Sequence, residues 1–139
     1  MEQIAKPLQD IAPPISRVLL SIIFIVAGFN KITGYSGTAG YMDMMGVPSA
    51  LLPLVIILEL GGGILLLVGY QTRLVAFLLA GFSLLSGLVF HLIPSFGMEG
   101  MAAQGETISF MKNLAIAGGL GFVFAYGAGG LSVDRRSKE

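Results

Sequence analysis

The sequence predicts an all-α membrane protein, a bundle of four transmembrane helices, and three observations lead to this fold class. Hydrophobic residues form 55% of the chain and charged residues only 12%, roughly half the charged share of an ordinary soluble domain. The mean hydropathy is +0.85. Four long apolar runs follow one another, each near the ~20 residues that a helix needs to cross a bilayer. Because these runs use most of the chain, we expect one membrane domain, residues 1–139, without a separate soluble domain.

The four spans are expected at about residues 15–32, 50–68, 74–92 and 110–126. Pro13 and Pro14 come just before the first span, where they suit the first turn of a helix because proline lacks an N–H. Ser49 and Ser109 are the candidate N-caps of the second and fourth spans. Helix ends are expected at three glycines, Gly34, Gly69 and Gly127. No span alternates polar and apolar residues, so a β-barrel is excluded.

The distribution of the cations predicts the orientation in the membrane. Six cations fall on one side of a four-span protein: Lys6, Arg17, Arg73, Arg135, Arg136 and Lys138. Only Lys31 and Lys112 fall on the other side. Since cytoplasmic segments retain the excess of Lys and Arg, we expect both termini in the cytoplasm, an N-in and C-in topology. The loops 35–49 and 93–109 then face outward.

Small residues predict where the helices approach one another, because apolar contact alone contributes little in lipid. The third span carries a stripe of them at Ala76, Ala80, Ser83 and Gly87. The fourth span repeats them every four positions, at Ala117, Gly121 and Ala125. We expect both stripes to build a tight bundle, and we assign none of these residues a chemical role.

Polar residues at membrane depth are the most informative feature, and Glu59 lies near the middle of the second span. A carboxylate there costs about 2.5 to 3.5 kcal/mol, so a compensating partner is expected. Helical side chains lean toward the N-terminus of their helix, which tilts Glu59 outward. Five polar residues near the outer ends of the other spans reach the same level: Asn30, Lys31, His91, Lys112 and Asn113. Together the six side chains predict one polar cluster in the outer half of the bundle.

This cluster has a functional and a structural interpretation. Around an apolar pocket, such groups could bind an oxygenated hydrophobic molecule and manage its protons. Glu59 and His91 would then be the catalytic pair that exchanges protons. Lys31 and Lys112 would hold an oxyanion, and Asn113 would orient a carbonyl oxygen. In the structural interpretation, Glu59 pairs with one lysine to hold the bundle in register, and the lysines are snorkelling anchors.

Composition excludes several functional classes. The formal net charge is zero, which leaves no basic surface for nucleic acid. The chain has no cysteine, so it forms neither a disulfide nor a thiolate metal site and cannot perform thiol exchange.

Six methionines lie on or beside the outer face: Met42, Met44, Met45, Met98, Met101 and Met111. Thioethers can bind Cu(I), but this spacing matches no strong metal motif, so we expect interfacial packing and no metal site.

Several motifs, taken together, extend over nearly the whole chain. They are Gly28-Phe29-Asn30-Lys31-Ile32-Thr33-Gly34, Met45-Gly46-Val47-Pro48, Leu58-Glu59, Gly69-Tyr70-Gln71-Thr72-Arg73, His91, Met111-Lys112-Asn113 and Ser132-Val133-Asp134-Arg135. In this order and spacing the chain resembles the DoxX family of small four-span bacterial proteins. The resemblance implies a multi-pass protein of the bacterial inner membrane. It also implies a link to quinones, because the family name derives from membrane subunits of a quinol oxidase and a thiosulfate:quinone oxidoreductase. Some relatives are implicated in complexes that handle oxidative stress.

The functional prediction combines the polar cluster with this resemblance. We expect an inner-membrane protein that binds a quinone-like or other small apolar molecule; if it is an enzyme, it is a membrane subunit of a quinone-linked oxidoreductase. The expected partners are the lipid bilayer, a redox complex and a second copy of the chain in a homo-oligomer. Two alternatives stay open. One is a non-catalytic membrane scaffold or anchor that recruits a redox partner, and the other is a small transporter, although the two halves show no clear repeat.

Overall fold

The computed structural model describes residues 2–137, and within this range it contains helices and no strand. Four helical segments are long and apolar enough to cross a membrane: Ala5–Thr33, Ser49–Val68, Thr72–Ser95 and Gly100–Tyr126. The predicted fold class, an all-α protein with four transmembrane helices, is confirmed. Lys138, one of the cations used to predict the orientation, lies outside the described residues.

The helices follow one another with short connections. In chain order they are α1 (Glu2–Thr33), α2 (Tyr35–Met44), η1 (Ser49–Leu51), α3 (Leu52–Ile56), η2 (Ile57–Gly61), α4 (Gly62–Val68), α5 (Thr72–Gly87), η3 (Leu88–Leu92), α6 (Ile93–Ser95), α7 (Gly100–Tyr126) and α8 (Val133–Arg136). The second span runs without a break from η1 to α4, and the third from α5 to α6. Each of these two spans contains a π-helical turn, η2 in the second and η3 in the third.

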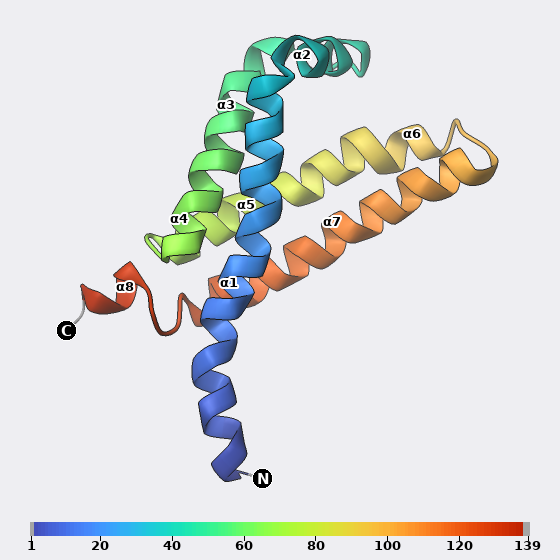
Figure 1. Cartoon of the computed structure of the whole chain (residues 1–139). Coiled ribbons are helices and arrows are strands. Elements are labelled where there is room, and N and C mark those ends of the chain that lie inside the picture. Colours follow the sequence, from blue (N-terminus) through green and yellow to red (C-terminus); the bar gives the residue numbers. More distant parts are fainter. Residues whose placement is uncertain (1, 138–139) are drawn as a thin grey trace.

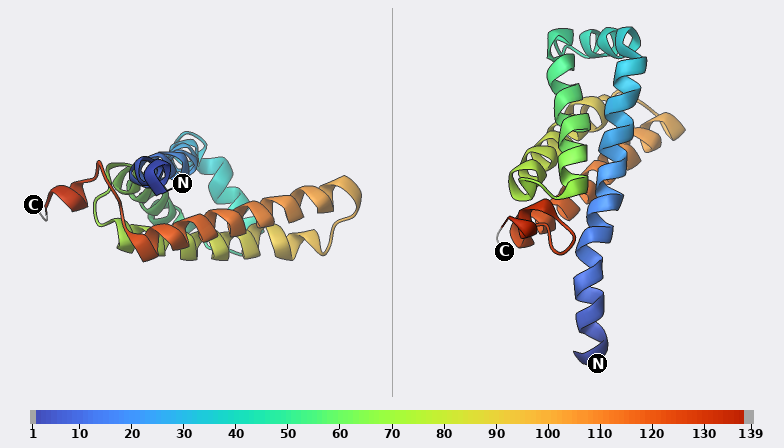
Figure 2. Two further views of the ribbon diagram at one scale, coloured as in Figure 1. Left: turned by 90° about the horizontal axis from the view of Figure 1, so that it is seen from below. Right: turned by 60° about the vertical axis from the view of Figure 1, so that its left-hand side comes forward.

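The bundle consists of two antiparallel helix pairs. α1 packs along the second span, mainly against η2 and α4, while α5 packs along α7. The two pairs cross each other, lie closest around α4 and the first half of α5, and diverge toward α2 and α6 (Figures 1 and 2). We call the end with α8 and the α4–α5 turn the terminal end, and the opposite end the α2 end.

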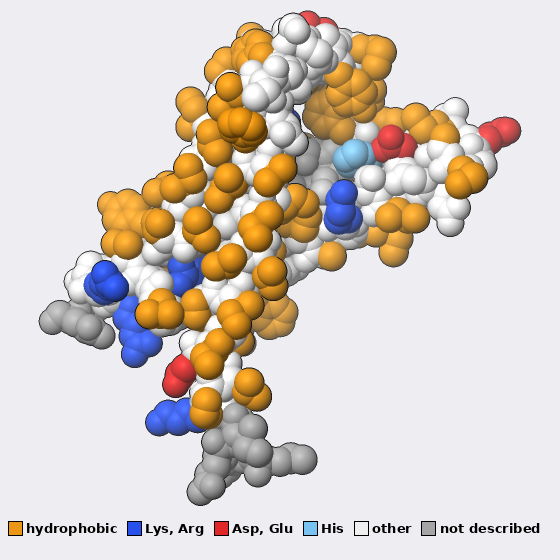
Figure 3. All heavy atoms as spheres, viewed as in Figure 1, with side chains coloured by type: hydrophobic (Ala, Val, Ile, Leu, Met, Phe, Trp, Pro, Cys, Tyr) orange, Lys and Arg blue, Asp and Glu red, His pale blue; other side chains and the backbone are white. Residues whose placement is uncertain are grey.

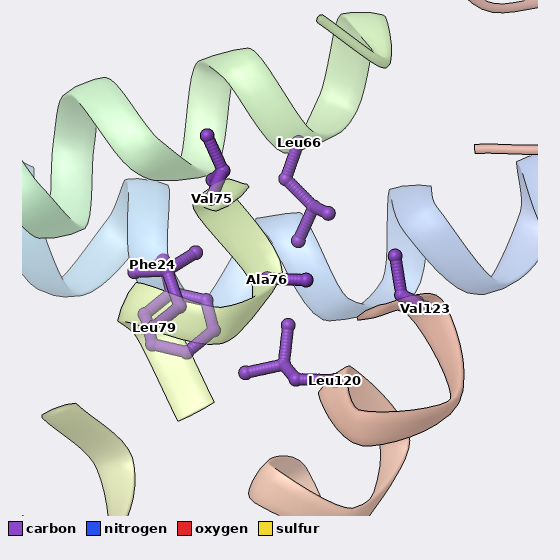
Figure 4. Close-up of a cluster of buried hydrophobic side chains, with 7 residues drawn as sticks. All are labelled: Phe24, Leu66, Val75, Ala76, Leu79, Leu120 and Val123. Carbon is purple, nitrogen blue, oxygen red and sulfur yellow. The ribbon is translucent and has the colours of Figure 1, made fainter. Parts of the chain in front are cut away.

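The hydrophobic core lies where the two pairs cross. Seven buried side chains pack together there: Phe24, Leu66, Val75, Ala76, Leu79, Leu120 and Val123 (Figure 4). They come from all four spans, so this cluster joins one pair to the other. Most large apolar side chains outside the core are exposed, as expected for helices whose outer surfaces face lipid tails.

Two glycines let α1 lie close to the second span. A Cβ on Gly28 would lie 2.7 Å from the backbone nitrogen of Leu60. A Cβ on Gly63 would lie 2.9 Å from Cγ1 of Ile25. Both distances are too short for real carbon atoms, so only glycine permits this approach. The contact matters for the site because Leu60 directly follows Glu59.

Three of the four small residues of the third span are buried and Ala80 is half-buried, whereas most of those on the fourth are exposed. Ala76 is fully buried and Ser83 is 3% exposed. On α7, Ala117 is buried, but Gly121 and Ala125 are exposed. The prediction of a packing stripe on the fourth span is therefore wrong beyond Ala117. α7 meets the core through the larger side chains of Leu120 and Val123, which turns the remaining small residues outward.

The first span begins earlier than predicted. α1 starts at Glu2, so Pro13 and Pro14 lie inside the helix and not in its first turn. A proline inside a helix removes the hydrogen bond to the carbonyl four residues earlier. Those carbonyls belong to Gln9 and Asp10, whose exposure lets water replace the lost bonds, and the helix continues.

The fourth span also begins earlier than predicted, at Gly100. Ser109 lies inside α7 and is not its N-cap. The residues before it include Ala, Gln and Glu, which favour helix, but polar residues and two glycines interrupt the apolar pattern there. Ser49, the predicted N-cap of the second span, makes no capping hydrogen bond with its side chain. Its backbone N–H instead donates to Oδ1 of Asp43 at 2.9 Å.

The predicted helix ends at glycine are confirmed. Gly69 and Gly127 follow α4 and α7 with φ values of +72° and +83°, a region that favours glycine. Gly34 separates α1 from α2. The third span continues through Pro94 to Ser95, so Pro94 lies in its last turn and the span ends just after it.

A buried arginine holds the terminal end together. Arg17 is 2% exposed. Its Nη1 donates to the carbonyl of Leu67 at 2.8 Å. Its Nη2 donates to the carbonyls of Gly130 and Leu131 at 3.0 and 2.9 Å. Arg17 thereby ties α1 to the end of α4 and to the segment that follows α7.

The C-terminal segment also caps α5. The carboxylate of Asp134 accepts hydrogen bonds from the N–H groups of Gln71 at 2.8 Å and Thr72 at 2.9 Å. The N–H of Asp134 donates to the carbonyl of Gly69 at 2.9 Å. The motifs 69–73 and 132–135, which are far apart in the sequence, therefore meet at the terminal end.

Candidate functional site

A cavity of about 550 Å³ lies between the two helix pairs, on the α2 side of the core. All six residues of the predicted polar cluster line it: Asn30, Lys31, Glu59, His91, Lys112 and Asn113. Figure 3 shows the histidine with an acidic and a basic side chain at a hollow between the pairs. Residues from four different spans thus converge on one space.

The most deeply buried charged group in the cavity is the carboxylate of Glu59. Its Oε2 lies 2.8 Å from Nζ of Lys31, and the two side chains are 6% and 26% exposed. The partner that a carboxylate at this depth requires is therefore supplied by α1. The close approach of α1 and η2 at Gly28 brings the two charges within reach.

Glu59 and His91 share an unusual local structure, which the sequence did not indicate. Glu59 belongs to the π turn η2 and His91 to the π turn η3. A π turn inserts one extra residue into a helix, changes the direction of the side chains around it and occurs frequently at functional sites. Both π turns border the cavity, so each helix is distorted at the residue that brings an ionisable group to it.

His91 has a partner that sequence analysis missed. Its Nδ1 lies 2.6 Å from Oε2 of Glu106, and both side chains are about one-third exposed at the rim. Glu106 was assigned to an outward loop because α7 was expected to begin later. The run of helix-favouring residues 101–104, which are Met, Ala, Ala and Gln, is the signal that could have placed Glu106 on the fourth helix, facing the third.

The other predicted residues lie at different depths. Asn30 and Lys112 are exposed at the rim, whereas Asn113 is half-buried. A Cβ on Gly87 would lie 2.9 Å from Nδ2 of Asn113. Gly87 therefore leaves the space that the Asn113 amide occupies in the cavity wall.

Helix α2 forms the wall of the cavity that lies farthest from the core. Thr38, Tyr41 and Met42 line it from one face of the helix, with the spacing i, i+3 and i+4. The ring of Tyr41 packs against the ring of Phe90, with centroids 5.7 Å apart. Met42 is 5% exposed, whereas Met44, on the other face, is 73% exposed.

The remaining wall of the cavity is mainly apolar. It includes Ile23, Phe24, Val55, Phe82 and Ile116, with hydroxyl groups from two serines of α5. Within residues 2–137, no three His, Cys, Asp or Glu side chains are grouped to hold a metal ion. A site with apolar walls, one buried ion pair, one imidazole–carboxylate pair and amides suits an apolar molecule that carries oxygen atoms.

The fold and the cavity together define a class: a small four-span membrane protein with one polar cluster enclosed by apolar walls. Comparison with known proteins gives the family. The DoxX family model matches residues 12–92, more than half of the chain. The chain belongs to the DoxX family.

Three relatives illustrate this membership. "Inner membrane protein YqjF" of Escherichia coli (strain K12) is 47% identical over 94% of this chain and 95% of its own length. "Inner membrane protein YphA" of the same organism is 35% identical over 88% of this chain and 87% of its own length. "Putative oxidoreductase CatD" of Bacillus subtilis (strain 168) is 37% identical over 51% of this chain and 53% of its own length. No solved structure matches the chain significantly.

The two Escherichia coli relatives are named as inner membrane proteins, which agrees with the four membrane-spanning helices of this chain. The chain is a multi-pass protein of the bacterial inner membrane, and the lipid bilayer is its surroundings. The predicted family and localisation are thereby confirmed.

Proposed function

We propose that the cavity between the helix pairs binds a quinone or a similar small apolar molecule that carries carbonyl oxygens. One observation carries the proposal: six polar side chains from four spans line a mainly apolar cavity of about 550 Å³. Cavities of roughly 300 to 1,000 Å³ with this combination of walls and polar groups are typical small-molecule sites. Membership of the DoxX family and the similarity to a relative named as an oxidoreductase support a redox-linked ligand.

Each polar group has a role in this proposal. A bound quinone would supply the redox chemistry, which consumes or releases protons together with electrons. Glu59 and His91 would give and take those protons. Lys31 and Lys112 would balance negative charge on a ligand oxygen, and the amide of Asn113 would donate to a carbonyl oxygen.

Glu106 would act through His91. A carboxylate at Nδ1 favours the tautomer that carries its proton on Nδ1, which leaves Nε2 as the nitrogen that exchanges protons. We therefore treat Glu106 as a positioning residue. The chain has no cysteine that could supply electrons through thiol chemistry. In this proposal a partner subunit in a redox complex would supply them.

The competing function is that of a non-catalytic membrane scaffold, and the Lys31–Glu59 ion pair favours it. The pair joins α1 to η2 at 2.8 Å. In this function its only role is to hold the two helices in register. In that case the cavity needs no ligand. The two functions predict different behaviour for the same variants.

The test compares ligand-induced stabilisation in variants of the whole chain purified in detergent. A short-tailed ubiquinone analogue at 100 times its Kd should raise the free energy of unfolding by about 2.7 kcal/mol. Glu59→Gln and His91→Gln should stay folded, because the amide keeps the size and much of the hydrogen bonding, yet lose this stabilisation. Glu99→Gln is the matched control, since Glu99 is exposed and outside the cavity wall.

Two outcomes would contradict the proposal. If both variants keep the full stabilisation by the quinone analogue, Glu59 and His91 are not in a ligand site. If the parent chain shows no stabilisation and Glu59→Gln loses about 3 to 5 kcal/mol of stability, the ion pair is structural, because breaking a buried pair costs about that much.

A further inference from the structure

A second pocket, of about 530 Å³, lies at the terminal end, on the other side of the core from the proposed quinone cavity. Its walls come from the α4–α5 turn, the end of α7 and the segment that leads into α8. Figure 3 shows basic side chains gathered at this end of the molecule. The proposed function makes no use of this pocket.

The walls of this pocket are built by hydrogen bonds within the chain. Asp134 caps the start of α5 through two N–H groups at 2.8 and 2.9 Å. Arg17 lies behind the wall and donates to the carbonyls of Gly130 and Leu131. Arg17 and Asp134 also interact electrostatically. The shape of the pocket is therefore set by the fold before any ligand arrives.

The pocket lining carries more positive than negative charge. Arg73 and Arg135 line it together with one carboxylate, that of Asp134. A Cβ on Gly127 would lie 3.4 Å from Nε of Arg73, and one on Gly130 would lie 3.5 Å from Nη1 of Arg135. Both guanidinium groups thus lie along the backbone that borders the pocket. With two guanidinium groups and one carboxylate, the lining has a net positive charge, so we expect an anion to be favoured there.

A buried hydroxyl group gives independent support for a ligand. Thr72 lines the pocket and is 1% exposed. Among the residues that the structure describes, none forms a hydrogen bond with its Oγ1. A buried polar group without a partner is costly. This hydroxyl has almost no exposed surface of its own, so it would donate to an oxygen of a bound anion after a rotation of the Thr72 side chain.

The depth of the pocket identifies the source of the anion. The second span ends at Val68, the third begins at Thr72 and the fourth ends at Tyr126, so the pocket lies where the spans leave the apolar layer. Tyr126 lines it and is 79% exposed, as is typical of aromatic residues at the headgroup level. Phospholipid phosphates lie at this level on both faces of a membrane.

We infer that this pocket binds the phosphate headgroup of an anionic phospholipid, with Arg73 and Arg135 as the charged contacts and Thr72 as a hydrogen-bond donor. Arginine suits this role because its planar guanidinium can bind two phosphate oxygens at once. Basic pockets at the ends of transmembrane helices are known to bind such headgroups. The site is independent of the quinone proposal, since the two pockets share no lining residue.

The test is a titration of the purified whole chain, followed by native mass spectrometry. Phosphatidylglycerol, phosphatidylcholine with the same acyl chains and inorganic phosphate are the three probes. Phosphatidylglycerol should bind most tightly. Arg73→Gln and Arg135→Gln should each weaken that binding about tenfold, because each removes a charge-assisted hydrogen bond to the phosphate. Arg136→Gln removes a neighbouring exposed charge outside the pocket and should change nothing.

Thr72→Val supplies a second variant that keeps the shape of the side chain. It should weaken phosphatidylglycerol binding while leaving thermal stability unchanged or higher, since the hydroxyl has no partner to lose within the described chain. Equal binding of phosphatidylcholine would overturn the inference. Equal losses in Arg136→Gln and Arg73→Gln would do so too, as they would indicate non-specific charge attraction. Displacement of the lipid by inorganic phosphate alone would show a free-anion site instead.

Discussion

At the scale of single residues, the two ends of the bundle stabilise buried charge in different ways. Glu59 faces one opposite charge, Lys31, across 2.8 Å. Arg17 instead distributes its charge over neutral backbone carbonyls of two segments. Each arrangement provides the partners without which a charge in an apolar environment costs several kcal/mol. The first borders a cavity and is partly open, whereas the second is closed.

The Arg17 arrangement predicts a large effect of Arg17→Lys. An ammonium group has no planar fork, so it cannot reach the carbonyl of Leu67 and those of Gly130 and Leu131 together. Each lost bond to a charged donor should cost about 1.5 to 3 kcal/mol of stability. Thermal unfolding in detergent measures this. Arg136→Lys, which alters an exposed arginine, is the control and should not change the midpoint. Equal midpoints for both variants would show that the Arg17 bonds contribute nothing.

At the scale of elements, the positions of the site groups depend on how the helices are deformed and how closely they approach. The π turns η2 and η3 each deform a span next to the cavity. Gly28 lets α1 touch η2, which places Lys31 beside Glu59. The site is therefore positioned by the backbone of three elements as much as by its own side chains.

Gly28→Ala should disturb this contact. Its Cβ would lie 2.7 Å from the backbone nitrogen of Leu60, and backbone atoms cannot turn aside as a flexible side chain can. We expect α1 to move away from η2, with a loss of about 1 to 3 kcal/mol, as for other overpacked sites. Thermal unfolding provides the measurement.

Gly118→Ala is the matched control for this variant. A Cβ on Gly118 would meet nothing within 4 Å, so α7 should gain up to about 1 kcal/mol from the better helix propensity of alanine. If Gly28→Ala stabilises the protein as much as Gly118→Ala does, then α1 and η2 are not in close contact.

At the scale of the whole molecule, two helix pairs share one core and separate toward the α2 end. The proposed quinone cavity lies in the space between them, and the arginine-lined pocket of the terminal end lies beyond the core. This shared core supports the proposal that residues 1–139 form one membrane domain. A homo-oligomer and a redox partner stay predictions.

The orientation is also a prediction at this scale, and the structure changes which cations support it. Arg17 is buried in hydrogen bonds and Lys31 is paired. Among the residues that the structure describes, the exposed cations are Lys6, Arg73, Arg135 and Arg136 at the terminal end and Lys112 at the other. The excess of exposed cations at the terminal end still predicts that this end faces the cytoplasm.

Reporter fusions measure this topology. Fusions after Tyr70 and at the C-terminus should report the cytoplasm, and fusions at Gly46 and Gly100 should report the outside. The reverse result at all four positions would place the quinone cavity in the cytoplasmic half of the membrane.

The sequence by itself determined the four spans and the depth of the polar cluster. A run of about 20 apolar residues must form a helix in lipid whatever surrounds it, because every backbone group needs a partner within the segment. Helices also rise by a constant length per residue, so Glu59, His91 and Asn113 could be assigned to one level from their positions alone. The family resemblance rested on the same local motifs.

Only the tertiary structure decided the helix ends in polar segments, the pairing of the spans and the partners of the buried charges. Residues 100–109 mix apolar residues with polar ones and two glycines and so form no continuous apolar run; for this reason α7 was expected to begin late and Glu106 was missed beside His91. Arg17 binds carbonyls of residues up to 114 positions away, and a carbonyl looks the same at every position of a sequence. The π turns were likewise invisible, because one extra residue in a helix leaves no mark in an apolar run. These features depend on contacts between distant segments, and a local pattern does not contain them.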